Sequence, residues 1–273
     1  MVIFPNAKIN IGLSVIRKRE DGFHDIESIF YPVGLNDALE YLPISGSTKG
    51  VSDKIAYSGR FPVKGKDICI KTIELLRESF SFPCLDLHLH KSIPPGSGLG
   101  GGSSDAAFLL NSLNNNYGFG LNREQLEEMA GRIGSDCPFF IRNKPCLVTG
   151  RGEKLEIIQL SLEGFYLVLV CPGIHLSTTD AYREVTPVQD STDLPTVAYT
   201  SIEKWKELII NQFEGSVFRK YPRIKEIKIE LYKLGAIYAS MTGSGSAVYG
   251  LFRSKIEITD KFSDCFIHRE WLH

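Results

Sequence analysis

The sequence has few cysteines, no excess of charge of either sign and no long apolar run. Its six cysteines among 273 residues form no C-x-x-C pair and show no repeated spacing. This pattern argues against a disulfide framework or a zinc site and favours reduced thiols in a cytoplasmic protein. The 31 basic and 32 acidic side chains leave a formal net charge of −1, whereas a dedicated nucleic-acid binder is strongly basic. We therefore expect no nucleic-acid partner.

The longest apolar stretch, residues 165–171, is far shorter than the ~20 residues that a membrane-spanning helix needs. Residues 1–16 have no basic region before their apolar residues and are interrupted by Pro5, Lys8 and Asn10, unlike a signal peptide. We expect a soluble cytoplasmic protein without a membrane partner. The sequence leaves the oligomeric state open.

Apolar patterns predict a mixture of helices and strands without regular β-α alternation. This mixture favours an α+β fold over a doubly wound sheet, and a change of pattern places a domain boundary near residue 150, between residues 1–150 and 151–273. Asn122 and Gln125 form a predicted capping box at a helix that ends at Gly134. We expect strands over 9–16, 26–31, 85–89, 165–170, 238–241 and 247–252, helices over 69–80, 106–113, 122–133, 202–209 and 224–234, a hairpin tip over 17–25, short strands and loops over 44–66, and a surface loop over 187–196.

The most informative segment is 94-PPGSGLGGGSSDAA-107, between a predicted strand and a predicted helix. Its glycines permit backbone conformations that turn N–H groups inward, and the helix start adds the positive end of its dipole. An anion cradle suited to phosphate follows. A flexible Gly/Ser linker is the simpler alternative, but the Pro-Pro start and the Ala-rich helix start favour phosphate binding.

Three common phosphate-binding motifs do not fit this segment. Gly96, Gly98 and Gly101 match the spacing of the dinucleotide fingerprint, but no second strand with an acidic residue follows. Gly102 stands where the Walker motif requires lysine. Protein-kinase motifs are missing downstream.

The segment P-x-G-x-G-L-G-G-G-S-S-x-A-A resembles the central motif of the GHMP kinases, a superfamily of small-molecule kinases. Residues 5-PNAKINIGL-13 resemble its first motif and 240-SMTGSGSAVYG-250 its third. The resemblance implies two α+β domains, a nucleotide-binding domain over 1–150 and a C-terminal GHMP-kinase domain over 151–273, with the active site in the interdomain cleft.

The resemblance also implies ATP as co-substrate, together with Mg²⁺. The family's usual glutamate metal ligand has no match here, so we assign no metal ligand, although the hydroxyls of Ser103 and Ser104 suit phosphate or Mg²⁺. Asp67 stands where the family often has asparagine. The implied ATP-binding residues are Lys91, Pro94, Pro95, Gly96, Ser97, Gly98, Leu99, Gly100, Gly101, Gly102, Ser103 and Ser104.

By the same resemblance, Asp136 is the catalytic base and Lys8 its charged neighbour. An alcohol does not ionise near neutral pH, so an acceptor hydroxyl benefits from a positioned carboxylate. A nearby lysine keeps that carboxylate ionised and offsets charge on the phosphoryl oxygens. The residue pattern alone also permits simpler interpretations: Asp136 as a turn residue, and Lys8 and Asn10 as solvent-facing strand residues.

Residues 20–30, 134–140 and 172–182 resemble one member of the superfamily, which phosphorylates the 2-hydroxyl of a cytidine diphosphate-linked methylerythritol in isoprenoid precursor synthesis. Phe23 stands where that member has tyrosine, so stacking on the pyrimidine is retained and a phenolic hydrogen bond is lost. The substrate-binding residues that this resemblance implies are Asn10, Phe23, His24, Thr178 and Tyr182.

Two alternatives stay open: another GHMP kinase acting on a mevalonate-type substrate, homoserine or a sugar, and a non-catalytic, ligand-sensing descendant. Lys8, Asp136 and the intact Gly-rich segment count against the second. His88 and His90 share one face of a predicted strand, but no third ligand accompanies them, so we expect both to face solvent.

Overall fold

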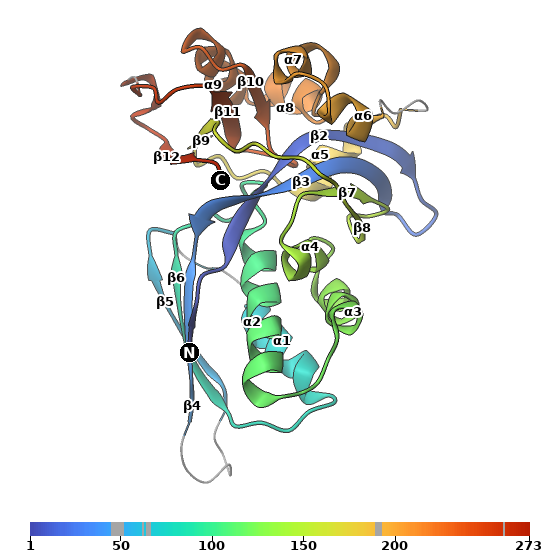
Figure 1. Ribbon diagram of the computed structural model, residues 1–273, viewed down its shortest axis with the longest axis vertical. Helices are drawn as coiled ribbons and strands as arrows, with labels where there is room; N and C mark the ends of the chain where they lie inside the picture. Colours follow the sequence, from blue (N-terminus) through green and yellow to red (C-terminus); the bar gives the residue numbers. More distant parts are fainter. Residues whose placement is uncertain (45–51, 62, 64–66, 189–192, 259) are drawn as a thin grey trace. The chain divides into compact units, whose positions relative to one another are not determined.

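A computed structural model describes residues 1–44, 52–61, 63, 67–188, 193–258 and 260–273 (Figure 1). Contacts divide the chain into two compact units, each made of three segments. Unit 1 contains Met1–Ala7, Leu35–Pro95 and Gly100–Asn143, and unit 2 contains Lys8–Gly34, Gly96–Leu99 and Lys144–His273. The chain therefore passes between the two units several times. The domain boundary near residue 150 and the active site in an interdomain cleft stay predictions.

Unit 1 is a four-stranded sheet covered on one face by helices (Figure 1). The strand order is β1-β4-β6-β5, and only the β5–β6 pair is parallel among these strands. The leucines of β6 are buried, while Asp86, His88 and His90 are exposed, which confirms the predicted alternation and the solvent-facing histidines. The elements are β1 (Val2–Ile3), β4 (Ala38–Pro43), β5 (Lys54–Gly59), β6 (Leu85–Lys91), α1 (Ile68–Arg77), α2 (Gly101–Tyr117), α3 (Arg123–Ile133) and α4 (Cys137–Arg142).

The capping box predicted for α3 is present. Asn122 Oδ1 accepts a hydrogen bond from Gln125 N at 2.9 Å, and Gln125 Oε1 accepts one from Asn122 N at 2.9 Å. The helix ends at Gly134, whose N–H donates to Ala130 O at 3.1 Å. Local sequence therefore fixes both ends of this helix.

Unit 2 combines two sheets with helices. The strands β9 (Tyr166–Cys171), β10 (Tyr238–Met241) and β11 (Val248–Phe252) are buried along their whole length. The helix α9 (Pro222–Lys233) packs against β10 and β11, and α8 (Glu214–Lys220) packs against α9. Val15 and Ile26 of the other sheet belong to the same apolar core. One sheet has the order β2-β3-β7-β8, with β2 (Asn6–Lys18), β3 (His24–Asn36), β7 (Cys146–Thr149) and β8 (Lys154–Ile157); the other has the order β10-β11-β9-β12, with β9 (Tyr166–Cys171), β10 (Tyr238–Met241), β11 (Val248–Phe252) and β12 (Phe266–Trp271).

The helices of unit 2 differ in part from the prediction. The helix expected over 202–209 is a 3₁₀ turn, η1 (Ile202–Lys204), followed by the single turn α7 (Trp205–Leu208). The chain leaves the helix because Ile210 O accepts from Leu13 N at 3.0 Å and Gln212 N donates to Leu13 O at 2.8 Å. The remaining helices are α5 (Thr178–Arg183), α6 (Leu194–Ala198), α8 (Glu214–Lys220), α9 (Pro222–Lys233) and η2 (Asp260–Phe262).

The prediction of a surface loop over residues 187–196 is wrong for its last three residues, 194–196, which are helical. Asp193 Oδ1 accepts from Thr196 N at 3.2 Å and so caps α6, which begins at Leu194. Residues 189–192 of this prediction, and residues 45–51, 62 and 64–66 of the loops predicted over 44–66, lie outside the described residues.

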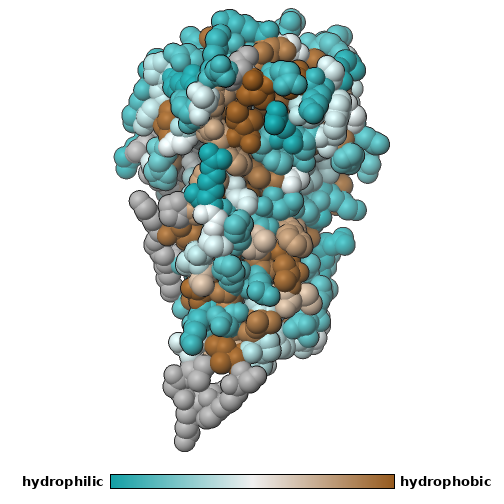
Figure 2. Space-filling view, turned by 90° about the vertical axis from the view of Figure 1, so that its left-hand side faces the viewer, coloured by the Kyte–Doolittle hydropathy of each residue, from teal (hydrophilic) through white to brown (hydrophobic). Residues whose placement is uncertain are grey.

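The α+β prediction is confirmed, because both units mix helices with largely antiparallel sheets. Apolar side chains lie in several separate patches among polar ones on the face seen in Figure 2. Across the described residues, no helix is long and apolar enough to cross a membrane. All six cysteines are free thiols.

Candidate active site

Lys8 lies on β2 and is buried, with 3% of its surface exposed. Its Nζ donates to Asn10 Oδ1 at 2.5 Å and to Gly98 O at 2.9 Å, and it lies 4.5 Å from the centre of the Phe30 ring. The backbone N–H of Lys8 donates to Leu99 O at 3.0 Å. Asn10 is also buried, with 1% of its surface exposed. Neither Lys8 nor Asn10 is therefore a solvent-facing strand residue.

Gly98 brings the first, second and third motifs together within unit 2. Its φ of +81° is in the left-handed region, and a Cβ there would overlap the carbonyl oxygen of Thr242. The Thr242 hydroxyl donates to two acceptors: Asn10 Oδ1 at 3.1 Å and Gly98 O at 3.3 Å. Only glycine permits this close approach of two backbones.

Lys91 is buried in unit 1 between two carboxylates. Its Nζ donates to Asp37 Oδ2 and, at 2.6 Å, to Asp105 Oδ2. Asp37 Oδ1 accepts from Ser92 N at 2.6 Å and from Ile93 N at 2.8 Å, which anchors the chain just before the Gly-rich segment.

Burial and mutual charge shift the pKa values of this cluster. Burial, together with the charge of Asp37, raises the pKa of Asp105 to about 8, although Lys91 opposes the shift. Burial lowers the pKa of Lys91, but Asp105 and Asp37 outweigh it and raise that pKa overall. Both shifts favour the protonated form of the group concerned, the ammonium of Lys91 and the carboxyl of Asp105.

A cavity of about 210 Å³ in unit 1 is lined by Lys91, Asp105, Pro95 and the first glycines of α2, and also by Asp67 and apolar side chains. A Cβ on Gly101 would lie 2.8 Å from Ile93 Cγ2, so glycine keeps the wall of this cavity close to the helix start. Four predicted ATP-binding residues line this one cavity: Lys91, Pro95, Gly101 and Gly102.

Asp67 has a structural task as well. Its Oδ1 accepts from Cys69 N at 2.6 Å and from Ile70 N at 3.4 Å, so it is the N-cap of α1. Asparagine and aspartate cap helices about equally well. The departure from asparagine therefore preserves the start of the helix and replaces an amide by a carboxylate at the cavity wall.

Asp136 immediately precedes α4 and is half-buried, and its side chain makes no capping bond to that helix. Next to it, burial raises the pKa of the Cys137 thiol to about 12, while a hydrogen bond with Ser103 opposes the shift. Ser104 is fully buried in α2, and its Oγ has no hydrogen-bond partner among the described residues. No group of three His, Cys, Asp or Glu side chains in the described part of the chain is arranged to hold a metal ion.

His24 and Tyr182 are stacked within unit 2, with ring centroids 4.9 Å apart. Phe23 is 52% exposed and lies against Arg151, whose guanidinium carbon is 5.0 Å from the ring centre. Thr178 begins α5, and its side chain lies outside the described residues. The structure thus pairs two of the predicted substrate-binding rings directly.

Further residues of the Gly-rich segment are fixed by close packing and backbone hydrogen bonds. Gly96 has a φ of +63°, and a Cβ there would lie 2.8 Å from His175 Nδ1. Ser97 is buried and its carbonyl accepts from Ala247 N at 3.1 Å, Leu99 is buried, and Gly100, with a φ of 74°, is the N-cap of α2.

The sequence alone indicates no role for five further residues near these sites: Asp37, Asp105, Ser28, Thr242 and Arg151. Three of them lie inside segments that carry the resemblance: Asp105 in the second motif, Thr242 in the third and Ser28 in residues 20–30. The pattern around Asp37 and Arg151 indicates no role for either residue. Only the folded chain places them beside predicted residues.

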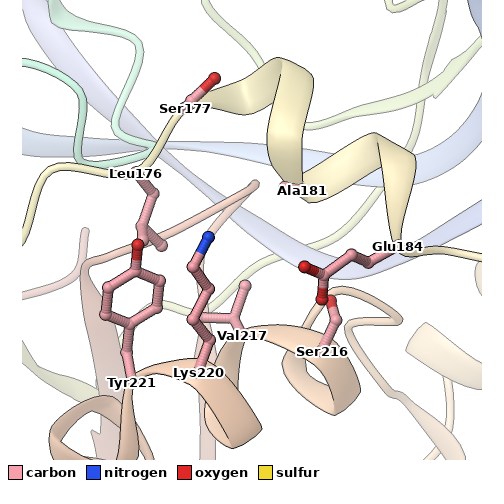
Figure 3. Close-up of a pocket in the computed structure, with 8 residues that line it drawn as sticks. All are labelled: Leu176, Ser177, Ala181, Glu184, Ser216, Val217, Lys220 and Tyr221. Carbon is pink, nitrogen blue, oxygen red and sulfur yellow. The ribbon is translucent and has the colours of Figure 1, made fainter.

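A second cavity lies between α5 and α8 (Figure 3). Ala181 of α5 and Glu184, just after that helix, line it on one side. Lys220, the last residue of α8, and Tyr221, its C-cap, line it on the other. None of the predicted site residues lines it.

Residues 67–144 match the family model of the GHMP kinases N terminal domain, and residues 199–267 match that of the GHMP kinases C terminal. A 4-diphosphocytidyl-2-C-methyl-D-erythritol kinase of Parabacteroides distasonis is 45% identical, covering 98% of each chain. One of Azobacteroides pseudotrichonymphae is 46% identical, covering 93% of this chain and 94% of that relative. A crystal structure of a 4-(cytidine 5'-diphospho)-2C-methyl-D-erythritol kinase superposes with a TM-score of 0.75 at 33% identity, covering 92% of this chain and 90% of that one. The chain belongs to the GHMP kinases and, among them, to the family of the 4-diphosphocytidyl-2-C-methyl-D-erythritol kinases.

Proposed function

We propose that this protein transfers a phosphoryl group from ATP to the 2-hydroxyl of 4-diphosphocytidyl-2-C-methyl-D-erythritol, a step of isoprenoid precursor synthesis. The observation that carries the proposal is full-length similarity to kinases named for this substrate. The stacked pair His24–Tyr182 supports it, because a pyrimidine gains stacking energy from aromatic rings.

In this proposal the nucleotide occupies the cavity lined by Lys91 and Asp105. Apolar side chains such as Val63, Leu89 and Ile93 line the same cavity and suit a purine ring. The left-handed glycines Gly98 and Gly100 and the start of α2 are proposed to hold the phosphates through backbone N–H groups.

The proposal assigns Asp136 the role of general base toward the acceptor hydroxyl. Lys8 is proposed to offset the negative charge that develops on the transferred phosphoryl group. Its hydrogen bonds to Asn10 and Gly98 fix the ammonium in place before substrate arrives, and such preorganised charge lowers the barrier without reorganisation. The remaining catalytic contribution is positioning of donor and acceptor.

Mg²⁺ is proposed to accompany ATP. A magnesium ion held by nucleotide phosphates needs only one or two protein oxygens, so the lack of a three-residue cluster among the described residues is compatible with it. The unpartnered Oγ of Ser104 is the residue atom in the Gly-rich segment that suits such a contact. When bound, the ion neutralises phosphate charge. The six free thiols favour the cytoplasm, a reducing compartment, as the location.

The test is an ADP-release assay with ATP·Mg²⁺ and three acceptors: 4-diphosphocytidyl-2-C-methyl-D-erythritol, mevalonate and homoserine. We expect turnover with the cytidine substrate alone and a product phosphorylated at the 2-hydroxyl by ³¹P NMR. Turnover with mevalonate or homoserine would favour the alternative GHMP kinases. Cytidine-ligand binding without turnover by folded protein would favour the ligand-sensing alternative.

A further inference from the structure

Ser28 lies on β3 with none of its surface exposed, between the Asn10 side chain and the backbone of β2. Its Oγ donates to Gly12 O at 2.6 Å, and Asn10 Nδ2 donates to Ser28 Oγ at 2.9 Å. We infer that Ser28 is a positioning residue, which fixes the orientation of the Asn10 amide and thereby the place of the Lys8 ammonium. This inference rests on the proposed function, in which Lys8 acts on the phosphoryl group.

The direction of the hydrogen bonds follows from the number of protons. A hydroxyl has one proton and a carbonyl only accepts, so the Ser28 proton points to Gly12 O. The lone pairs of Ser28 Oγ are then left to accept from an N–H group. With the opposite amide orientation, Asn10 Oδ1 would face these lone pairs, and neither oxygen would supply a proton.

The other end of the amide has the complementary requirement. Asn10 Oδ1 accepts from Lys8 Nζ at 2.5 Å and from Thr242 Oγ1 at 3.1 Å. A reversed amide would place its NH₂ group against the ammonium, where both groups only donate. Ser28 and Lys8 therefore demand the same orientation of Asn10, and removal of the serine hydroxyl takes away one of the two constraints.

The Ser28 hydroxyl is already used within the strands, as donor to Gly12 O and as acceptor from Asn10 Nδ2, so its role does not require a contact with a substrate. Its effect passes through Asn10 to Lys8, which also donates to Gly98 O at 2.9 Å. A loosened Lys8 changes charge stabilisation in the transition state more than substrate binding, so kcat is the sensitive parameter.

The experiment compares two variants, Ser28→Thr and Ser28→Val. Threonine keeps the hydroxyl, and valine has nearly the shape of threonine but no hydroxyl. We expect Ser28→Val to lower kcat about tenfold with KM for ATP within about twofold, and Ser28→Thr to retain most of kcat. Ser14→Ala changes a second buried serine, which lies on β2; this variant is the matched control and keeps wild-type kcat. Equal losses in the Thr and Val variants would overturn the inference. Should Ser28→Val fail to fold, Ser28→Ala takes its place.

A double-mutant cycle separates positioning from general destabilisation. If Ser28 acts through Asn10, Ser28→Val has little further effect on kcat in an Asn10→Ala background. The same fold-loss in both backgrounds would overturn the inference, because it would mean that Ser28 acts independently of the amide.

A second readout needs no substrate. The side-chain NH₂ signals of Asn10 are assigned in a ¹⁵N spectrum as the pair that Asn10→Ala removes. We expect this pair at its wild-type position in Ser28→Thr and shifted or broadened in Ser28→Val; an unchanged pair in Ser28→Val overturns the inference. Absence of turnover in the wild-type protein contradicts the proposed function instead, so the two failures are distinguishable.

Discussion

His24 and Tyr182 stack with their ring planes inclined by 23°. Tyr182 is supported by Phe213, which meets it edge-on at 4.8 Å. Burial and the nearby charge of Lys18 lower the pKa of His24, so its ring is neutral at pH 7 and offers one donor and one acceptor to a nucleobase. The pair thus combines an apolar surface with hydrogen-bonding capacity, as recognition of a cytosine ring requires.

Removing the Tyr182 ring is expected to weaken cytidine binding. Tyr182→Ala should raise KM for the cytidine substrate about 5-fold or more, because base–aromatic stacking contributes ~1–3 kcal/mol, while KM for ATP changes little. Tyr182→Phe keeps the ring and stays near wild type. Steady-state kinetics with each substrate varied in turn checks this, with the exposed Tyr199 changed to alanine as control. An unchanged KM in Tyr182→Ala would remove this ring from the cytidine site.

Asp136→Asn is expected to lower kcat by about 10²–10⁴-fold, because the amide cannot accept the hydroxyl proton. The substitution preserves size, so the KM values and the melting temperature stay near wild type. Single-turnover kinetics measure the loss, and Asp86→Asn on the exposed sheet face is the control for removal of a carboxylate. Retention of more than a tenth of kcat would mean that another group is the base.

Gly98→Ala is expected to abolish most activity and to destabilise unit 2. The methyl group would overlap Thr242 O, and the φ of +81° disfavours any residue with a Cβ. Gly131→Ala is the control, since Gly131 lies inside α3 with Pro138 Cγ 3.8 Å from the new methyl group; there alanine should stabilise the helix by about 0.5–1 kcal/mol. Urea unfolding and ADP release measure the two effects. Wild-type stability of Gly98→Ala would contradict the close approach of the second and third motifs.

Elements with a complete local signal could be predicted from the sequence. The helix α3 carries its N-cap, its apolar face and its terminal glycine within one short segment, and β6 alternates strictly. By contrast, α7 ends early because residues 210–212 pair with Leu13, nearly 200 positions away. No local pattern contains that partner, and a tertiary contact here overrides helical periodicity.

The candidate site shows the same division. The motifs predict functional roles for Lys8, Gly98 and Asp136. The contacts that position Lys8, however, come through Asn10, which is bound by Ser28 and Thr242. A buried serine in a strand has no sequence signature that distinguishes it from a packing residue. The role of Ser28 depends on its hydroxyl proton being donated to Gly12 O, and only the folded chain brings these two groups together.

The raised pKa of Asp105 is expected to make stability depend on pH. Burial raises this pKa from 3.8 to about 8, so between these values the folded chain holds a proton that the unfolded chain has lost. The free energy of unfolding therefore falls as pH rises from about 4 to 8, by at most about 1.4 kcal/mol per pH unit. Lys91, whose pKa is raised above 10.5, titrates outside this range.

Asp105→Asn removes this proton uptake, so its urea midpoint should change less between pH 6 and pH 8 than that of the wild-type protein. Urea titrations at pH 6, 7 and 8 measure the difference in slope. Asp264→Asn is the control: Arg223 lowers the pKa of Asp264 by a hydrogen bond, so the stability that this carboxylate adds is lost only as pH falls below about 4. That variant keeps the wild-type slope from pH 6 to 8. The same slope in Asp105→Asn as in wild type would show that Asp105 is already ionised at neutral pH, and the Lys91 cluster would then carry a net negative charge.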